Sequence, residues 1–163
     1  MVEVPYSLSP GEFVRSQTEE VGVGQTYQSI TINAPVESVW STLRDFHDMS
    51  WAPNVITGLE IIGDAGGDEP GAGRVLNGAF HETLQEINDE DRTFAYTIDD
   101  GPSPISKDDV KNYVGRVSVQ AGDGEGSTLV EWSSSWEQND EATFEFCHGI
   151  YIALLDELKN TLE

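Results

Sequence analysis

Glu82 has the clearest potential for chemistry in this chain, because it interrupts an apolar strand pattern. In the predicted strand that starts at Phe80, both Phe80 and Leu84 share a face with Glu82, which falls between them. A carboxylate buried on such a face loses hydration, so its pKa rises and it can act as a general acid or base. Two alternatives stay open: a one-residue slip or bulge turns Glu82 to solvent, or Arg74 or Arg116 pairs with it.

Aromatic side chains gather on one face of three further predicted strands. The alternation places together, strand by strand, Phe94 with Tyr96, then Tyr113 with Gly115, then Trp132 with Trp136. Aromatic residues arranged in this way either fill a core or wall an apolar cavity, and in a cavity the tyrosine hydroxyls would orient a ligand. Tyr96 is thus the second candidate for proton transfer.

Other kinds of chemistry find little support in the chain. His47, His81 and His148 are scattered without a second ligand at zinc spacing, so we expect no metal site. No phosphate-binding, dinucleotide-binding or serine-hydrolase motif is present, and we expect no cofactor. Cys147 is the only cysteine, so it has no disulfide partner within the chain; we interpret it as core filler rather than as a nucleophile.

A long helix at residues 140–162 is the element around which these strands must be organised. Its apolar residues recur in steps of three and four, at Phe144, Cys147, Tyr151, Leu154, Leu155, Leu158 and Leu162. Asn139 or Asp140 can cap its first turn. Gly149 interrupts the helix, which either close helix–sheet contact or room for a ligand would explain.

The remaining elements form a simple order along the chain. Residues 1–24 are predicted to be an N-terminal arm, and residues 25–163 one domain, which opens with a strand at 25–33. Two short helices follow, the first after Pro35 and the second, which a turn could replace, at 48–51. Turn signals then separate six short strands, an arrangement typical of an antiparallel meander, at residues 56–63, 74–78, 80–87, 93–98, 113–120 and 128–137.

Several short motifs within this order resemble the polyketide cyclase/dehydrase family of the helix-grip superfamily. They include Ile32-Asn33-Ala34-Pro35 with Trp40, Trp51-Ala52-Pro53, Gly71-Ala72-Gly73-Arg74, Glu82-Thr83-Leu84, Asp91-Arg92-Thr93-Phe94-Ala95-Tyr96, Gly101-Pro102-Ser103-Pro104, Asn112-Tyr113-Val114-Gly115 and Val130-Glu131-Trp132-Ser133. The resemblance covers about residues 26 to 162. It implies an α+β helix-grip fold, in which a curved seven-stranded antiparallel sheet wraps around the long C-terminal helix.

The resemblance also implies a ligand cavity between the sheet and that helix. We expect the ligand to be a small apolar or aromatic molecule contacted by Trp51, Phe80, Glu82, Leu84, Phe94, Tyr96, Pro102, Pro104, Tyr113, Trp132, Trp136, Cys147 and Tyr151. The loop that contains Pro102 and Pro104 corresponds, by this resemblance, to a gate loop in the plant abscisic acid receptors of the same superfamily. A cyclase, dehydratase or aromatase acting on such a molecule through Glu82 or Tyr96 is the alternative. A co-chaperone-like interaction domain is a third hypothesis, which requires a well-filled interior.

The charge of the chain restricts its partners and surroundings. Thirty acidic against eight basic residues give a net charge of −22, which repels nucleic acid and anionic membranes. No run of about 18 apolar residues is present, and the first residues do not have the pattern of a secretory signal. We therefore expect a cytoplasmic protein, monomeric or homodimeric, adapted to concentrated salt, because salt screens this self-repulsion.

Overall fold

Seven antiparallel strands form one open sheet in the computed structural model, which describes residues 23–138 and 141–163. Their order across the sheet is β1-β7-β6-β5-β4-β3-β2. The strands are β1 (Val23–Ile32), β2 (Leu59–Ile62), β3 (Gly73–Leu76), β4 (Phe80–Asn88), β5 (Thr93–Asp100), β6 (Lys111–Ala121) and β7 (Thr128–Glu137). The predicted N-terminal arm lies almost wholly outside the described residues, as do both candidate caps of the long helix.

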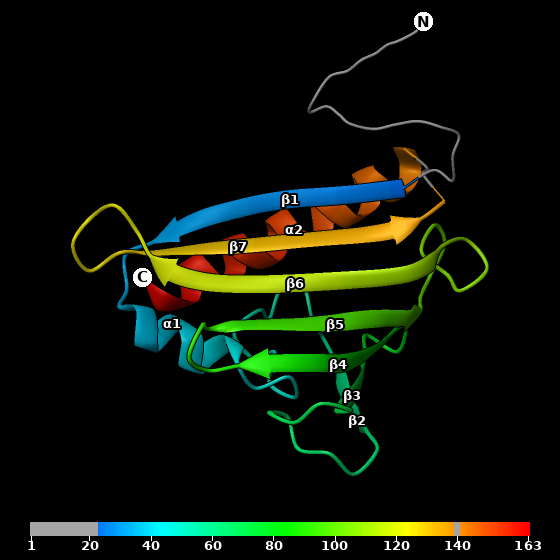
Figure 1. Ribbon diagram of the computed structural model, residues 1–163, viewed down its shortest axis with the longest axis horizontal. Coiled ribbons are helices and arrows are strands. Elements are labelled where there is room, and N and C mark those ends of the chain that lie inside the picture. Colours follow the sequence, from blue (N-terminus) through cyan, green and yellow to red (C-terminus); the bar gives the residue numbers. More distant parts are fainter. Residues whose placement is uncertain (1–22, 139–140) are drawn as a thin grey trace, which may run out of the picture.

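Two helices complete the described part of the fold. Helix α2 (Glu141–Leu162) lies behind the sheet in Figure 1 and runs along β1 and β7, so the predicted α+β helix-grip architecture is confirmed. Helix α1 (Val36–Leu43) starts directly after Pro35 and lies near the C-terminal end of α2 (Figure 1). The second short helix is replaced by turns between Asp45 and Ile56, closed by bonds such as Ala52 N–H to the Met49 carbonyl.

The alternation of buried and exposed residues agrees with the predicted strand faces. On β7, Val130, Trp132, Ser134 and Trp136 are buried, and on β6 Tyr113, Gly115, Val117 and Val119 are buried. Arg116 points to the opposite, outer face and forms an ion pair with Glu86 there. Pairing of β4 with β5 is irregular at two places, yet Phe80, Glu82 and Leu84 all keep their side chains on the inner face.

Helix α2 buries a slightly different stripe from the predicted one. Thr143, Cys147, Tyr151, Leu154, Leu155 and Leu158 are its buried residues, whereas Phe144 is 37% exposed and stacks on His148. Gly149 also lies outside this stripe, and a Cβ at that position would meet no atom within 4 Å. Neither close helix–sheet contact nor room for a ligand therefore explains this glycine.

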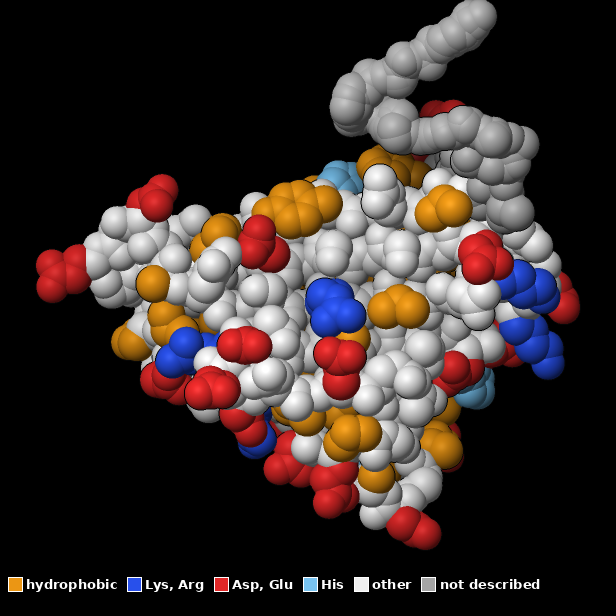
Figure 2. All heavy atoms as spheres, viewed as in Figure 1, with side chains coloured by type: hydrophobic (Ala, Val, Ile, Leu, Met, Phe, Trp, Pro, Cys, Tyr) orange, Lys and Arg blue, Asp and Glu red, His pale blue; other side chains and the backbone are white. Residues whose placement is uncertain are grey.

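Acidic side chains are spread over the outer face of the sheet and its rim, as Figure 2 shows, and basic side chains there are few. The described basic residues mostly take part in ion pairs, of which Arg44–Asp89, Arg92–Glu37 and Lys159–Glu163 are exposed. Exposed pairs of this kind contribute little to stability, about 0–1 kcal/mol each. The fold is therefore held mainly by the core between the sheet and the helices.

Candidate functional site

A cavity of about 190 Å³ lies inside this core, between α2 and the inner face of the sheet. One wall comes from α2, and the opposite wall comes from inward-facing residues of β3 to β7. Eighteen residues line it: Met49, Val55, Ile56, Arg74, Leu76, Asn77, Phe80, Glu82, Tyr96, Ile98, Ile105, Tyr113, Trp132, Phe146, Cys147, Ile150, Tyr151 and Leu154. Most of these side chains are apolar, so the cavity suits an apolar guest.

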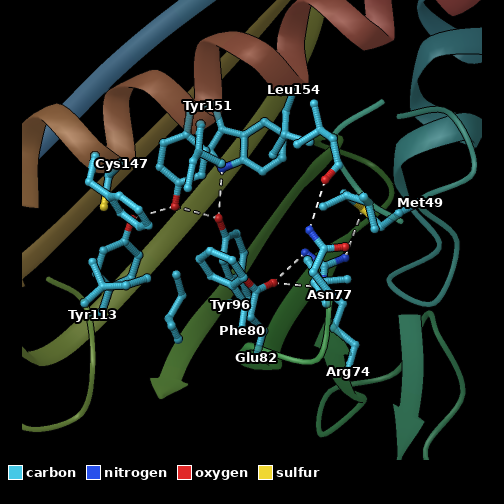
Figure 3. A pocket seen from close by; sticks show the side chains of 18 residues that line it. Met49, Arg74, Asn77, Phe80, Glu82, Tyr96, Tyr113, Cys147, Tyr151 and Leu154 are labelled. Atoms are coloured by element: carbon cyan, nitrogen blue, oxygen red, sulfur yellow. Dashed lines mark hydrogen bonds and ion pairs between the residues drawn. The ribbon is translucent and has the colours of Figure 1, made fainter. Parts of the chain in front are cut away.

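Three tyrosine hydroxyls meet on one side of the cavity (Figure 3). The hydroxyl of Tyr151 on α2 lies 2.9 Å from that of Tyr96 and 2.6 Å from that of Tyr113. The indole N–H of Trp132 donates to the Tyr96 oxygen at 3.0 Å. Burial raises the pKa of all three tyrosines, so the hydroxyls stay protonated and act as hydrogen-bonding groups rather than as bases.

Gly115 makes room for this cluster. Tyr96 and Gly115 are directly paired across β5 and β6, and a Cβ on residue 115 would lie 2.3 Å from Cζ of Tyr96. A side chain at position 115 would therefore displace the Tyr96 ring. The glycine allows the hydroxyl of Tyr96 to reach Tyr151 and Trp132.

An ion pair between Arg74 and Glu82 forms the other polar part of the cavity wall (Figure 3). The two residues face each other across β3 and β4 and are only 4% and 6% exposed. Both contacts go to one carboxylate oxygen, Oε1, from Nε at 2.8 Å and from Nη2 at 2.7 Å. The guanidinium also donates to the Phe46 carbonyl at 3.0 Å and lies 3.7 Å above the centre of the Phe46 ring. Its charge is thus compensated inside the protein.

The carboxylate of Glu82 is already bonded to Arg74, so it is less available to take up a proton than a catalytic base would be. Burial raises the pKa of its carboxyl, and the nearby guanidinium of Arg74 acts in the opposite direction. The sequence alternative in which Arg74 pairs with Glu82 is the one that the structure shows, and Arg116 is the partner of Glu86 instead.

Some of the residues predicted to contact a ligand lie together in the cavity wall. They are Phe80, Glu82, Tyr96, Tyr113, Trp132, Cys147 and Tyr151. Cys147 lies beside Tyr113, and burial raises the pKa of its thiol, which disfavours a role as nucleophile.

The other predicted contact residues lie outside the cavity wall. Trp51, Leu84 and Phe94 are buried in the surrounding core, and Phe94 packs there against Trp40 and Phe46. Trp136 stacks on Tyr113 at 5.6 Å, and its indole N–H has no hydrogen-bond partner among the described residues.

The loop of Pro102 and Pro104 reaches the cavity through a different residue. Ile105, which is 2% exposed, is the loop residue in the cavity wall, whereas both prolines lie outside it. The carbonyl of Pro104 accepts a hydrogen bond from Thr143 at 3.2 Å, which ties the loop to the start of α2. Loop residues have no periodicity, so no pattern in the sequence indicates which side chain of this loop points inward.

Other lining residues were absent from the predicted contact set, although some had a signal in the sequence. Phe146, Ile150 and Leu154 follow one another at intervals of four along α2, which places them on one line of the helix. Ile98 shares the inner face of β5 with Tyr96. Met49, Val55, Ile56 and Asn77 come from turns, where no such signal exists.

Two phenylalanines bridge the sheet and the helix at the edge of the cavity. Phe80 at the start of β4 and Phe146 in the first turns of α2 stack with ring centres 6.3 Å apart. Both are partly buried and both line the cavity. This aromatic pair therefore lies between the cavity interior and solvent.

Metal-binding and membrane-spanning features are absent from the described ranges 23–138 and 141–163. Within them no three His, Cys, Asp or Glu side chains come together as a metal-binding group. None of the described helices is long and apolar enough to cross a membrane.

Comparison with known proteins agrees with this geometry. A family model described as polyketide cyclase/dehydrase and lipid transport matches residues 24–163. A protein from Nitrosospira multiformis is 40% identical, with a TM-score of 0.83 over 86% of this chain and 97% of its own. The protein XoxI from Bacillus cereus is 29% identical, with a TM-score of 0.71 over 85% of this chain and 94% of its own. A search of curated proteins finds none that matches the chain.

Proposed function

The chain belongs to the polyketide cyclase/dehydrase and lipid transport family, and we propose that it binds a small apolar or aromatic molecule between α2 and the sheet. The observation that carries this proposal is the cavity, which is walled by apolar side chains and contains a few converging hydroxyl groups. Such a combination of apolar walls and a few placed polar groups is typical of small-molecule sites.

The size of the cavity limits the ligand. An apolar cavity of about 150 Å³ is large enough to hold benzene, so about 190 Å³ suits a molecule of one or two rings. Burial of its apolar surface would supply the affinity, at about 25 cal/mol per Å². The proposed contacts are the predicted residues in the cavity wall together with Ile98, Ile150 and Leu154.

Two alternatives receive less support from the site. A co-chaperone-like interaction domain of the same fold should have a well-filled interior. The cavity between α2 and the sheet does not favour that hypothesis. Acid–base catalysis by Glu82 is the stronger rival, because its buried carboxyl lines the cavity. The test is a Glu82→Gln variant assayed with a substrate that the wild type turns over. Loss of turnover with retained substrate binding would favour the enzyme hypothesis, and unchanged turnover would exclude Glu82 from catalysis.

A cavity-filling variant tests the binding proposal. Leu154 is buried in the cavity wall, so Leu154→Trp would occupy space that a ligand needs. Ile152→Trp is the matched control on the same helix, since Ile152 is 42% exposed. Isothermal titration calorimetry with aromatic probes of the size of naphthalene should show similar binding to the wild type and to Ile152→Trp. Binding of the same probes to Leu154→Trp should be at least tenfold weaker. Equal binding by all three proteins would contradict a site in this cavity.

The surroundings of the protein are part of the proposal. A net charge of −22 supports a cytoplasm rich in salt, where counter-ions screen the repulsion between surface carboxylates. We propose that the protein works as a monomer or homodimer and without a cofactor.

A further inference from the structure

The carboxylate of Glu82 uses only one of its two oxygens within the described part of the protein. Both contacts from Arg74 end on Oε1, from Nε at 2.8 Å and from Nη2 at 2.7 Å (Figure 3). No described residue donates a hydrogen bond to the other oxygen, Oε2. An ionised carboxylate can accept about four hydrogen bonds on its two oxygens, so this group has unused accepting capacity.

The second oxygen is not sealed inside the core. Among the described residues, Trp136 Nε1 is the only fully buried side-chain nitrogen or oxygen without a hydrogen-bond partner. Oε2 of Glu82 also lacks a partner but is not such an atom, so it keeps some accessible surface. Glu82 lines the cavity and is otherwise buried, at 6% exposed, so this surface opens to the cavity.

Arg74 holds the carboxylate in a fixed position. Its Nη1 donates to the Phe46 carbonyl at 3.0 Å and lies 3.5 Å from Sδ of Met49, and its Cζ lies 3.7 Å from the centre of the Phe46 ring. A guanidinium held by these contacts keeps its carboxylate partner from turning. A ligand that bonds to Oε2 therefore meets an acceptor that needs little further ordering on binding.

A fixed and unused acceptor in an apolar wall favours a ligand that donates a hydrogen bond. We propose that Oε2 of Glu82 accepts a hydrogen bond from the ligand, and that the ligand is a small, mostly apolar, neutral molecule with an O–H or N–H donor, such as an alcohol, a phenol or an amide. This inference rests on the proposed function and specifies the chemistry of its ligand.

The charges in the cavity wall explain why the donor would be neutral. Glu82 and Arg74 are the only acidic and basic residues in that wall, and their charges cancel as a pair. A cationic ligand would add a buried positive charge without a counter-ion, and an anionic ligand would add a negative one; both are costly in an apolar site. A neutral donor bonds to Oε2 without changing this balance.

Three probes of nearly the same shape test the inference. 1-Phenylethanol carries an O–H donor, acetophenone carries only an acceptor oxygen, and cumene carries neither. The double variant Arg74→Met/Glu82→Leu removes the acceptor without leaving a buried charge unpaired, and such apolar replacements of an ion pair are often tolerated. We expect it to weaken 1-phenylethanol binding at least tenfold relative to acetophenone and cumene, which corresponds to about 1.4 kcal/mol for a hydrogen bond to a charged group.

The exposed ion pair between Arg116 and Glu86 provides the matched control. Arg116→Met/Glu86→Leu makes the same two substitutions on the outer face of the sheet, where the two side chains are 49% and 64% exposed. This variant should leave the affinities for all three probes unchanged.

The outcomes separate this inference from the function on which it rests. If the probes bind to the wild type but Arg74→Met/Glu82→Leu changes all three affinities by the same factor, or weakens acetophenone as much as 1-phenylethanol, the inference is overturned and the binding function stands. If none of the probes binds to the wild type, the binding function fails, and the inference fails with it.

A measurement on the wild type covers the case in which the double variant does not fold. The carbon-13 resonance of Cδ in Glu82 should shift when 1-phenylethanol binds, because a hydrogen bond to Oε2 withdraws electron density from the carboxylate. Acetophenone and cumene should produce a much smaller shift. A Glu82 resonance that responds equally to all three bound probes would overturn the inference.

Discussion

The ring of Tyr96 occupies the space where a side chain on Gly115 would lie. The two residues are paired across β5 and β6, and a Cβ at position 115 would be 2.5 Å from the Tyr96 hydroxyl oxygen and closer still to the ring. The position of the Tyr96 hydroxyl in the cavity thus depends on the absence of a side chain at Gly115 in the neighbouring strand.

Replacement of Gly115 by alanine should therefore damage the site. The new methyl group would force the buried Tyr96 ring away from Tyr151 and Trp132, at a cost of about 1–3 kcal/mol for overpacking. Chemical denaturation should show this loss, and titration with acetophenone should show weaker binding.

Gly149→Ala is the matched control, because a Cβ there meets nothing within 4 Å. Alanine favours the helix over glycine by about 1 kcal/mol, so this variant should be more stable than the wild type. If the two alanine variants changed stability in the same direction, the placement of Tyr96 over Gly115 would be wrong.

Loss of the buried ion pair should be expensive. In Glu82→Gln the guanidinium of Arg74 stays buried without a counter-charge, and removal of one partner of such a pair typically costs about 3 kcal/mol. Urea denaturation at neutral pH measures this change. The comparison variant is Glu86→Gln, whose carboxylate pairs with Arg116 but is 64% exposed, so a change below about 1 kcal/mol is expected. Similar effects of the two variants would refute the buried pair.

The inner face of the sheet shows how much of the site could be predicted from the sequence. Alternation along the chain placed Glu82, Tyr96, Tyr113 and Trp132 on the inner face, because strand geometry alone fixes which face a residue occupies. It could not tell how deep in the core each residue lies. Trp136 and Phe94 share those inner faces, yet they pack beside the cavity rather than in its wall.

The elements themselves were more predictable than the site. The long helix and most strands follow from apolar spacing and turn residues, and β7 agrees with its predicted bounds. The contribution of Ile105, by contrast, depends on how an irregular loop folds back toward α2. No local pattern encodes such a contact.

Alkaline pH should unfold the protein through the tyrosine cluster. Burial raises the folded-state pKa of Tyr96, Tyr113 and Tyr151 above the unfolded value of about 10. The stability linked to these groups is therefore complete below pH about 10 and is lost as the pH rises toward their folded-state pKa. Tyrosinate absorbance, followed together with circular dichroism, should rise in one step with unfolding.

Tyr27 provides the internal reference for this titration. Its hydrogen bond to Glu131 also raises its pKa, but its ring is 58% exposed, so it can ionise while the protein stays folded. Tyr27→Phe should leave the amplitude of the unfolding step unchanged, and Tyr151→Phe should reduce it. Ionisation of the cluster in the folded protein would contradict its burial.

Salt should stabilise the protein at neutral pH. With a net charge of −22, repulsion between carboxylates weakens as the screening length falls from about 10 Å at 0.1 M salt to about 3 Å at 1 M. The melting temperature should rise over this range, and the rise should shrink near the sequence pI of about 4.1, where the net charge vanishes. A melting temperature that falls steadily with added salt at neutral pH would argue against salt adaptation.

The cavity is tested most directly by locating a bound probe. Intermolecular nuclear Overhauser effects between acetophenone and the methyl groups of the protein should connect the probe to Ile98, Ile150 and Leu154, which line the cavity. Exposed Ile61 and Ile152 should show no such effects. Contacts from a saturating probe to Ile61 or Ile152 alone would place binding on the surface and contradict a ligand site between α2 and the sheet.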